Sequence, residues 1–470
     1  MPLRLTQSKV RKVNGSPARA HAAALLLFLT AGAPSAKAQQ FFARAEQGAD
    51  TRYGVARHGV DQLGASPQRV VSQPSTAPEE RNDLVPAWES ELVRNHAAAP
   101  ASMRFRPGKG LEVKTGDGRF ALITRLRAQF LYDYESVSGA EDRQAFQIRR
   151  ARLQFLGNFW GKHNTFKVEF AVAPRDMARQ PIALSDNTNS AANVVGTTPL
   201  LDWYVTFDHL RDLTLRVGQY KIPYSRQRVV SSGNLQFVDR AVTNAEFTLD
   251  RDLGLDFRSK DFLGLGVLKY YAGVYIGEGR NTSNKTRGAG DLGLMALGRI
   301  EVLPFGMFKD YSEADFERSF RPRLSIGAGY AYLRNAPGSR GILGSTPKQQ
   351  VNYHNANADL LFKFAGLCVL SDFYVRKGRG GEDLSDGYGW MLQGGYLLPY
   401  TALEFGARYG MTRPRGRSSV LKGKNELGVV VGHYFAQHPL KVQADLFQLW
   451  NQGSKAGQNT RLRVQLQAAF

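Results

Sequence analysis

Polar and apolar residues alternate through most of this chain, and this pattern restricts the possible folds more than any other feature of the sequence. In the terminal segment RLRVQLQAAF, Leu462, Val464 and Phe470 share one parity, whereas Arg461 and Arg463 share the other. Successive side chains of a β-strand point to opposite faces, so this segment predicts a strand with one apolar and one cationic face. Such a strand fits either a soluble sheet over a core or a barrel in a membrane.

Sixteen segments alternate in this way, from RFALITRLRAQFLYDYE to the terminal RLRVQLQAAF. After residue 38 no apolar stretch reaches the roughly 18 residues that a membrane-spanning helix needs, and a closed barrel is the other structure that satisfies its backbone in lipid. Aromatic residues such as Tyr134, Trp160 and Trp450 lie near segment ends, where membrane interfaces place them. We therefore predict an all-β fold, a transmembrane antiparallel β-barrel of about sixteen strands. A large soluble β-protein with an aromatic core is the alternative.

The N-terminus predicts export. Basic residues precede the apolar run AHAAALLLFLTAGA, and Ala36-Lys37-Ala38 fits the small-x-small rule, so residues 1–38 are expected to be a cleaved signal peptide. Residues 39–110 lack periodicity and are rich in Ala, Gln, Pro and Ser, which predicts a flexible periplasmic segment. Residues 111–470 would then form the barrel, in the outer membrane of a Gram-negative cell.

Composition excludes several functions. Lys and Arg number 62 against 41 Asp and Glu, but no basic helix, zinc-ligand set or RNP-like motif accompanies this excess, so no nucleic acid is expected as a partner. Cys368 is the only cysteine, which excludes an intrachain disulfide and a cysteine-based metal site. The histidines lack a nucleophile elbow or an HExxH motif. We expect no enzyme, no metal and no cofactor.

If the apolar parity meets lipid, the other parity lines the lumen, and its cations outnumber its acids. The acids that clearly face inward are Asp133, Glu169, Asp202, Glu404 and Asp445. The inward cations are Arg125, Arg127, Arg150, Arg152, Lys167, Arg216, Lys269, Arg323, Arg408, Lys441, Arg461 and Arg463. Walls of Arg and Lys are expected in an anion or phosphate pore, and the planar guanidinium can bind two oxygens of a phosphate at once. A simple balance of charge with acids on neighbouring strands is the alternative.

Two blocks stand out. In IRRAR, Arg150 and Arg152 share a face about 7 Å apart, whereas Arg149 has the other parity and is expected near a strand end. In the second block, Pro223 ends a strand because it cannot donate to the ladder, and about 28 residues pass before the next alternating run. A connection of that length is usually functional.

The motifs RRARLQFLGNF, VGQYKIPYSRQ, LQFVDRA and RDLGLDF occur in this order over about residues 147 to 257, and DGRF precedes them at 117–120. In the order of these motifs the chain resembles the phosphate-selective porin family of the O and P type. The C-terminal half is similar only in its general pattern of alternating strands. The resemblance implies a sixteen-stranded outer-membrane barrel, usually trimeric, that passes phosphate or related anions. In porins the long loop after this part of the barrel folds inward and narrows the channel, which would place Arg226, Arg228, Arg240 and Arg251 at the constriction. An outward extracellular loop is the alternative.

The sequence thus predicts a passive anion-conducting porin for phosphate or polyphosphate-like ions, with outer-membrane lipid around it and a homotrimeric assembly. The predicted anion-binding residues are Arg125, Arg127, Arg150, Arg152, Lys167, Arg216, Lys221, Arg226, Arg228, Arg240, Arg251 and Lys269. Anion preference is better supported than phosphate selectivity. A general porin and a plugged structural barrel stay as alternatives, and a barrel-borne hydrolase is the least favoured.

Overall fold

The computed structural model describes residues 100–173, 178–182, 194–281, 293–344, 349–381, 384–416, 419–453 and 458–470. The cleavage site expected after Ala38 and residues 39–99 of the expected flexible segment lie outside this part of the chain. No helix in the described ranges has the length and apolar character needed to cross a membrane.

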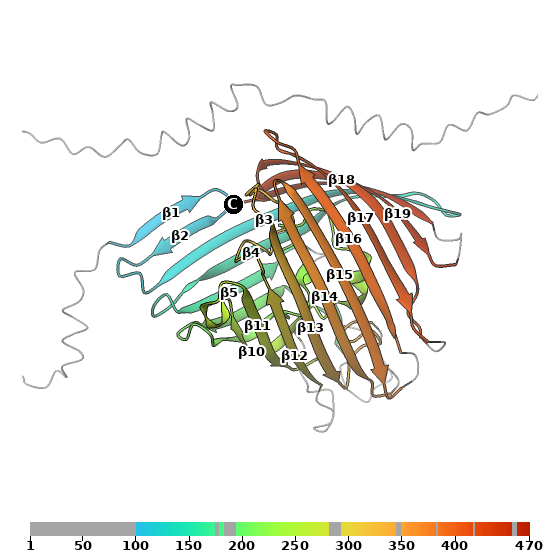
Figure 1. Ribbon diagram of the computed structural model, residues 1–470, viewed down its shortest axis with the longest axis horizontal. Coiled ribbons are helices and arrows are strands. Elements are labelled where there is room, and N and C mark those ends of the chain that lie inside the picture. Colours follow the sequence, from blue (N-terminus) through green and yellow to red (C-terminus); the bar gives the residue numbers. More distant parts are fainter. Residues whose placement is uncertain are drawn as a thin grey trace, which may run out of the picture. The chain divides into compact units, whose positions relative to one another are not determined.

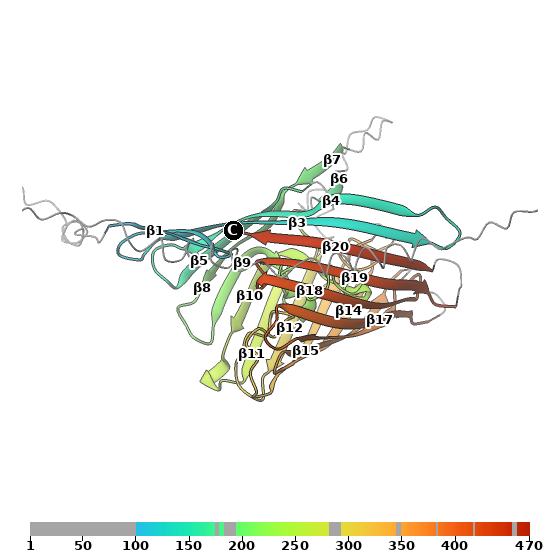
Figure 2. The same ribbon diagram turned by 90° about the horizontal axis from the view of Figure 1, so that it is seen from above.

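Sixteen strands of the described chain form one closed antiparallel barrel, as the alternation predicts (Figures 1 and 2). Each strand pairs with the next, and β20 (Asn459–Ala469) closes the ring against β3 (Ala121–Val137). The backbones of Phe470 and Leu126 exchange two further hydrogen bonds of 2.8 and 3.2 Å at this seam. The other fourteen are β4 (Arg143–Asn158), β5 (Asn164–Ala171), β8 (Leu200–Phe207), β9 (Thr214–Lys221), β10 (Arg251–Ser259), β11 (Leu268–Tyr275), β12 (Leu294–Val302), β13 (Arg323–Arg334), β14 (Asn352–Phe364), β15 (Leu367–Arg379), β16 (Gly387–Leu397), β17 (Leu403–Pro414), β18 (Lys424–Ala436) and β19 (Leu440–Asn451).

The strands expose their apolar parity and bury their polar parity. In β12 all nine positions alternate between exposed and buried. The outward Ile300 is 54 % exposed, whereas its neighbours Arg299 and Glu301 are buried at the inner face. A soluble β-protein would show the opposite arrangement, because its apolar faces would form the core. The outer wall therefore fits hydrocarbon, and the soluble alternative is wrong.

Two further strands extend the sheet at one end of the barrel. β1 (Ser102–Arg106) pairs with β2 (Gly110–Lys114), and β2 continues the ladder along β3 at residues 121–124, where β20 no longer reaches. The sheet thus begins at Ser102, ahead of the expected start of the barrel at residue 111. The hairpin of β1 and β2 joins the sheet because β2 forms backbone hydrogen bonds with β3.

The two ends of the barrel differ in the length of their connections. One end carries the connections 172–199, 222–250, 276–293 and 335–351, and the first of these includes the ribbon of β6 (Ala178–Ile182) and β7 (Val194–Thr198). The other end carries short turns such as 365–366 and 437–439, and the turn 260–267 holds the 3₁₀ turn η2 (Phe262–Gly264). Long loops are extracellular and short turns periplasmic in outer-membrane barrels, which orients this one.

The connection 222–250, called the inward segment below, crosses the interior of the ring. It contains α4 (Arg226–Val229) and α5 (Val242–Phe247). Its hydrogen bonds reach inward residues of β3 and β4 on one side and of β13 to β19 on the other. A segment bonded to strands on opposite sides of a barrel lies in its lumen.

Glycines on the inner wall make room for the inward segment. A Cβ at Gly329 of β13 would lie 2.6 Å from the carbonyl oxygen of Tyr224, and a Cβ at Gly395 of β16 would lie 2.1 Å from the Nε2 atom of Gln236. Both distances are shorter than van der Waals contact, so a larger residue at either position would displace the segment.

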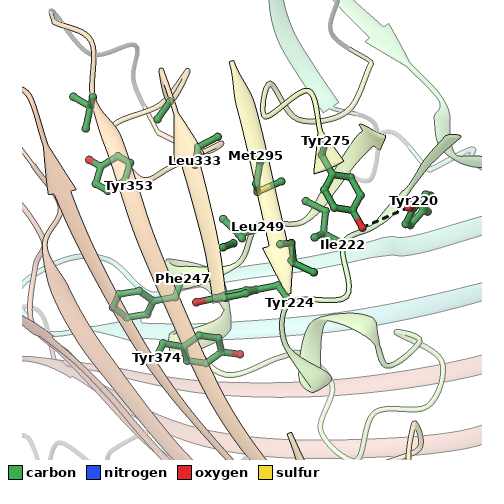
Figure 3. Close-up of a cluster of buried hydrophobic side chains, with 14 of the residues drawn as sticks. Tyr220, Ile222, Tyr224, Phe247, Leu249, Tyr275, Met295, Leu333, Tyr353 and Tyr374 are labelled. Atoms are coloured by element: carbon green, nitrogen blue, oxygen red, sulfur yellow. Dashed lines mark hydrogen bonds between the residues drawn. The ribbon is translucent and has the colours of Figure 1, made fainter. Parts of the chain in front are cut away.

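An apolar cluster packs residues of the inward segment against β11 to β15 (Figure 3). The rings of Phe247 and Tyr374 stack with centroids 5.8 Å apart, and the ring of Tyr224 lies 6.2 Å from that of Tyr374. Burial of such rings is worth about 2–3 kcal/mol each. The apolar cluster therefore holds the inward segment against this wall.

A second connection, residues 303–322, enters the lumen from the periplasmic end, and we call it the acidic segment. Its Asp310, Glu313 and Asp315 are buried. Asp310 accepts hydrogen bonds from Lys269 of β11, and the Gly366 backbone donates to Asp315 at 2.8 Å. The alternation of the strands could not predict these inward acids, because they lie in a connection and not in a strand of the wall.

Candidate functional site: an arginine-lined cavity in the lumen

A cavity of about 770 Å³ lies between the inward segment and the wall formed by β3, β4, β5, β8, β9, β10 and β17 to β20. Within the described chain its lining includes twelve arginines, two lysines and five acids. The lining cations are Arg127, Arg149, Arg150, Arg152, Lys167, Arg216, Lys221, Arg228, Arg240, Arg251, Arg280, Arg408, Arg461 and Arg463, and the acids are Glu169, Asp202, Asp239, Asp250 and Glu426. Like charges on narrow walls focus the field, so this cavity attracts anions.

A β-bulge brings two adjacent arginines into the cavity. The ladder between β3 and β4 pairs Gln129 with Arg150 and then Phe130 with Ile148, so Arg149 has no partner across the strand. An extra residue in a strand shifts the parity on one side of it. The expectation that Arg149 lies near a strand end is therefore wrong: it lies within β4 and lines the cavity beside Arg150.

The carboxylate of Asp239, on the inward segment, bridges these two arginines. Arg149 Nη2 donates to Oδ2 and Arg150 Nη2 donates to Oδ1, each at 2.8 Å. Burial raises the pKa of Asp239, but the two guanidinium groups outweigh it and hold that pKa well below its ordinary value. Each guanidinium donates to a different oxygen of the carboxylate, so the two arginines together hold one oxyanion by charge-assisted hydrogen bonds.

A second group of cations at the same cavity has fewer acidic partners. Lys221 Nζ donates to the carbonyl oxygen of Val230 at 3.1 Å, and Arg240 Nη2 donates to the same oxygen at 2.6 Å. Neither side chain forms an ion pair within 4.0 Å among the described residues, whereas Arg228 pairs with Asp250. Burial lowers the pKa of the Arg240 guanidinium, and the positive charges of the nearby Arg150 and Arg251 lower it further. Positive charges are therefore close together in this group.

An alternating chain of charges continues along the wall. Arg152 donates to Glu169 at 2.6 Å, Lys167 bridges Glu169 and Asp202 at 2.6 Å each, and Arg251 donates to Asp202 at 2.6 Å. These residues come from β4, β5, β8 and β10. Shared carboxylates fix the three cations in place, so the cavity is charged and rigid at once.

The remaining predicted cations are held by hydroxyls and rings. Arg127 donates to Ser231 Oγ at 3.0 Å and to Ser232 Oγ at 2.9 Å, both on the inward segment. The guanidinium of Arg216 lies 4.2 Å from the ring centroid of Tyr204, a cation–π contact.

Nine of the twelve predicted anion-binding residues thus meet at one cavity, and three do not. Arg125 donates to the Lys109 carbonyl oxygen at 2.7 Å, beside the turn between β1 and β2. Arg226 and Lys269 lie in a separate buried network on the side of the acidic segment. The alternation along a strand predicts whether a side chain faces the lumen or the lipid, but it does not predict which acids lie beside that side chain.

That network balances three cations with three acids. Arg226 pairs with Asp359 at 2.8 Å and with Asp310 at 3.0 Å, and Arg299 pairs with Asp359 at 2.7 Å. Glu301, which lies 2.8 Å from Arg299, completes it together with Lys269. Arg226, expected at the constriction, is thus buried in this network and does not line the cavity, whereas Arg228, Arg240 and Arg251 do.

Four lining residues were not predicted from the sequence, namely Arg280 and the acids Asp239, Asp250 and Glu426. Asp239 and Asp250 lie in the long connection, where no periodicity indicates a direction. Glu426 has the inward parity of β18, so it could have been found by extending the count to that strand. Arg408, Arg461 and Arg463 were found by parity and do line the cavity.

Comparison with known proteins agrees with this architecture. Residues 124–329 match the family model of phosphate-selective porin O and P. A protein of Aquifex aeolicus (strain VF5), described as uncharacterized, is 25% identical over 289 residues, which are 57% of this chain and 67% of that protein.

Among solved structures, an anion-selective porin from Comamonas acidovorans superposes with a TM-score of 0.50 at 13% identity, over 74% of this chain and 99% of that one. The OmpTdeltaL8 loop-deletion mutant of Vibrio cholerae OmpT gives a TM-score of 0.47 at 12% identity, over 74% and 99% of the two chains. The superposition on the Comamonas acidovorans protein shows that the described chain has the barrel fold of an outer-membrane porin. The match to the phosphate-selective porin O and P family covers residues 124–329, which include the motifs from RRARLQFLGNF to RDLGLDF on which the predicted resemblance rests.

Proposed function

We propose that this protein passively conducts anions across the outer membrane, phosphate and polyphosphate-like ions among them. The observation that carries the proposal is the cavity, with fourteen cations and five acids among its described lining residues. Fixed guanidinium and ammonium groups replace the hydration of an anion while the acids keep the cations in position. The family and the fold are those of a channel, and we infer that the protein needs neither catalysis nor a cofactor.

Recording in planar bilayers tests this proposal. With a KCl gradient across the bilayer, we expect a reversal potential of the sign that chloride preference produces, because the excess of cations lining the cavity repels potassium. Added phosphate is expected to reduce the chloride current, since phosphate would occupy the same cations. A cation-preferring potential contradicts the proposal, and a chloride-preferring current that phosphate leaves unchanged favours a general anion porin.

A plugged structural barrel is the second candidate, because the inward and acidic segments both lie in the lumen and bond to its wall. The same recording separates the two candidates. A barrel that folds and inserts but shows no conductance would support the plug.

We also propose a homotrimer, because one wall is too short to face lipid. β5, β8, β9 and β11 have eight residues each and β10 and β12 have nine. Eight residues tilted by 35–45° rise only about 20 Å, less than the roughly 25 Å apolar band of such barrels. A partner subunit would cover this wall. Light scattering in detergent is expected to give three times the chain mass, and a monomer mass contradicts this assembly.

A further inference from the structure

A patch of basic side chains lies on the outer wall of the barrel, away from the lumen. Arg334 of β13, Lys377 and Arg379 of β15, and Arg413 of β17 occupy outward positions at the extracellular ends of their strands, and we call these four residues the rim patch. The first three are exposed. In the part of the chain that the structure describes, none of the four forms an ion pair with Asp or Glu.

The strand register brings the rim patch together. His354 of β14 pairs with Tyr332 of β13 and with Lys377 of β15, so these three side chains share one row on the outer face. Arg379 lies one row nearer the strand ends, opposite Asn352. With strands about 4.8 Å apart and same-face residues about 7 Å apart, the four cations spread over about 20 Å of the wall.

Aromatic residues lie directly below the rim patch. Tyr330 is 49 % exposed on the outer face, and its hydroxyl lies 2.6 Å from His354 Nδ1. Further toward the middle of the wall the outward residues are apolar, for example Ile326, Phe373 and Leu392. Tyrosines mark the interface between hydrocarbon and headgroups, so the rim patch lies at the level of the headgroups.

The opposite end of the same strands has no such cations. Its outward positions are Leu324, Phe362, Phe364, Leu367, Val369, Tyr396, Leu403 and Phe405. A requirement for solubility alone would place charge at both ends of the wall. The basic charge therefore distinguishes one leaflet from the other.

We propose that the rim patch binds the phosphate groups of a phosphorylated glycolipid in the outer leaflet. β13 to β17 have 11 to 13 residues, enough to span the apolar band and face lipid directly. The outward positions of these strands include no acid that would repel an anionic headgroup. This inference depends on the orientation of the barrel and not on anion conduction, so either can fail alone.

The test uses the full chain in nanodiscs of phosphatidylcholine doped with a bisphosphorylated glycolipid, lipid A, or with its dephosphorylated form. Co-purified lipid is measured by mass spectrometry. The wild type is expected to retain the phosphorylated form, and Lys377→Gln/Arg379→Gln to bind it roughly tenfold or more weakly, since each surface cation contributes about fivefold to anionic-lipid binding. Raised salt is expected to weaken lipid binding by the wild type until it approaches that of the variant, because salt screens the attraction between exposed charges.

The matched control is Arg119→Gln/Lys162→Gln, which removes two exposed cations at the periplasmic end and is expected to bind like the wild type. The shift in gel migration on heating, unchanged from the wild type, shows that each variant folds. The proposal is overturned if both forms of the lipid bind equally, if inorganic phosphate alone displaces the lipid, or if the two double variants behave alike. It is also overturned if the rim-patch variant changes only the oligomer mass, because a second copy of the chain would then occupy this face.

Discussion

Replacing Arg226 with methionine is expected to destabilise the folded barrel by about 3–5 kcal/mol. The guanidinium of Arg226 is fully buried and pairs with Asp359 and Asp310, and its Nη2 donates to Ser325 Oγ at 2.7 Å. Methionine fills a similar volume but leaves three buried carboxylates with two cations, Arg299 and Lys269. The midpoint of thermal unfolding in detergent, followed by the shift in gel migration of heated samples, measures the loss.

Two further variants make this result specific. Arg226→Met/Asp359→Asn restores the balance of charge, so we expect it to recover part of the lost stability. Arg211→Met removes an arginine that is 64 % exposed, and a change within about 0.5 kcal/mol is expected there. Equal stability of Arg226→Met and the wild type would show that the network does not anchor the inward segment.

Replacing both Lys221 and Arg240 with glutamine is expected to weaken the block of chloride current by phosphate roughly 10- to 100-fold. Each cation would contribute a charge-assisted hydrogen bond of about 1.5–3 kcal/mol to a bound oxyanion, part of which the glutamine amide retains. Both side chains donate only to backbone carbonyls of the inward segment in the described structure. Their loss therefore leaves no buried carboxylate unpaired, and the barrel is expected to fold.

The opposite change is expected from Asp239→Asn. It removes the negative charge that bridges Arg149 and Arg150, so those guanidinium groups become available and phosphate is expected to block at lower concentration, by roughly fivefold. Arg119→Gln/Lys162→Gln, which alters charge outside the lumen by the same amount as the first pair, serves as the control. If Lys221→Gln/Arg240→Gln and this control give the same phosphate block, the cavity is not where phosphate binds.

The faces of the strands could be predicted because the alternation of a strand is local. Each residue needs only its neighbours to determine its side, so Arg150, Arg152 and Lys167 were placed on the inner wall without knowledge of any partner strand. The same argument failed at Arg149, because a bulge depends on the pairing of β3 with β4 and adds a residue that breaks the period.

The sixteen strands, the outer apolar wall and the excess of basic residues inside could be predicted, since they follow from a period of two and from composition. Which cations remain available to an anion depends on the folded arrangement of the chain. Arg226 and Lys221 lie five residues apart, yet one is neutralised by Asp310 and Asp359 and the other faces the cavity. Charge pairing acts over distances in space, and the closure of the barrel brings residues more than one hundred positions apart within 3 Å.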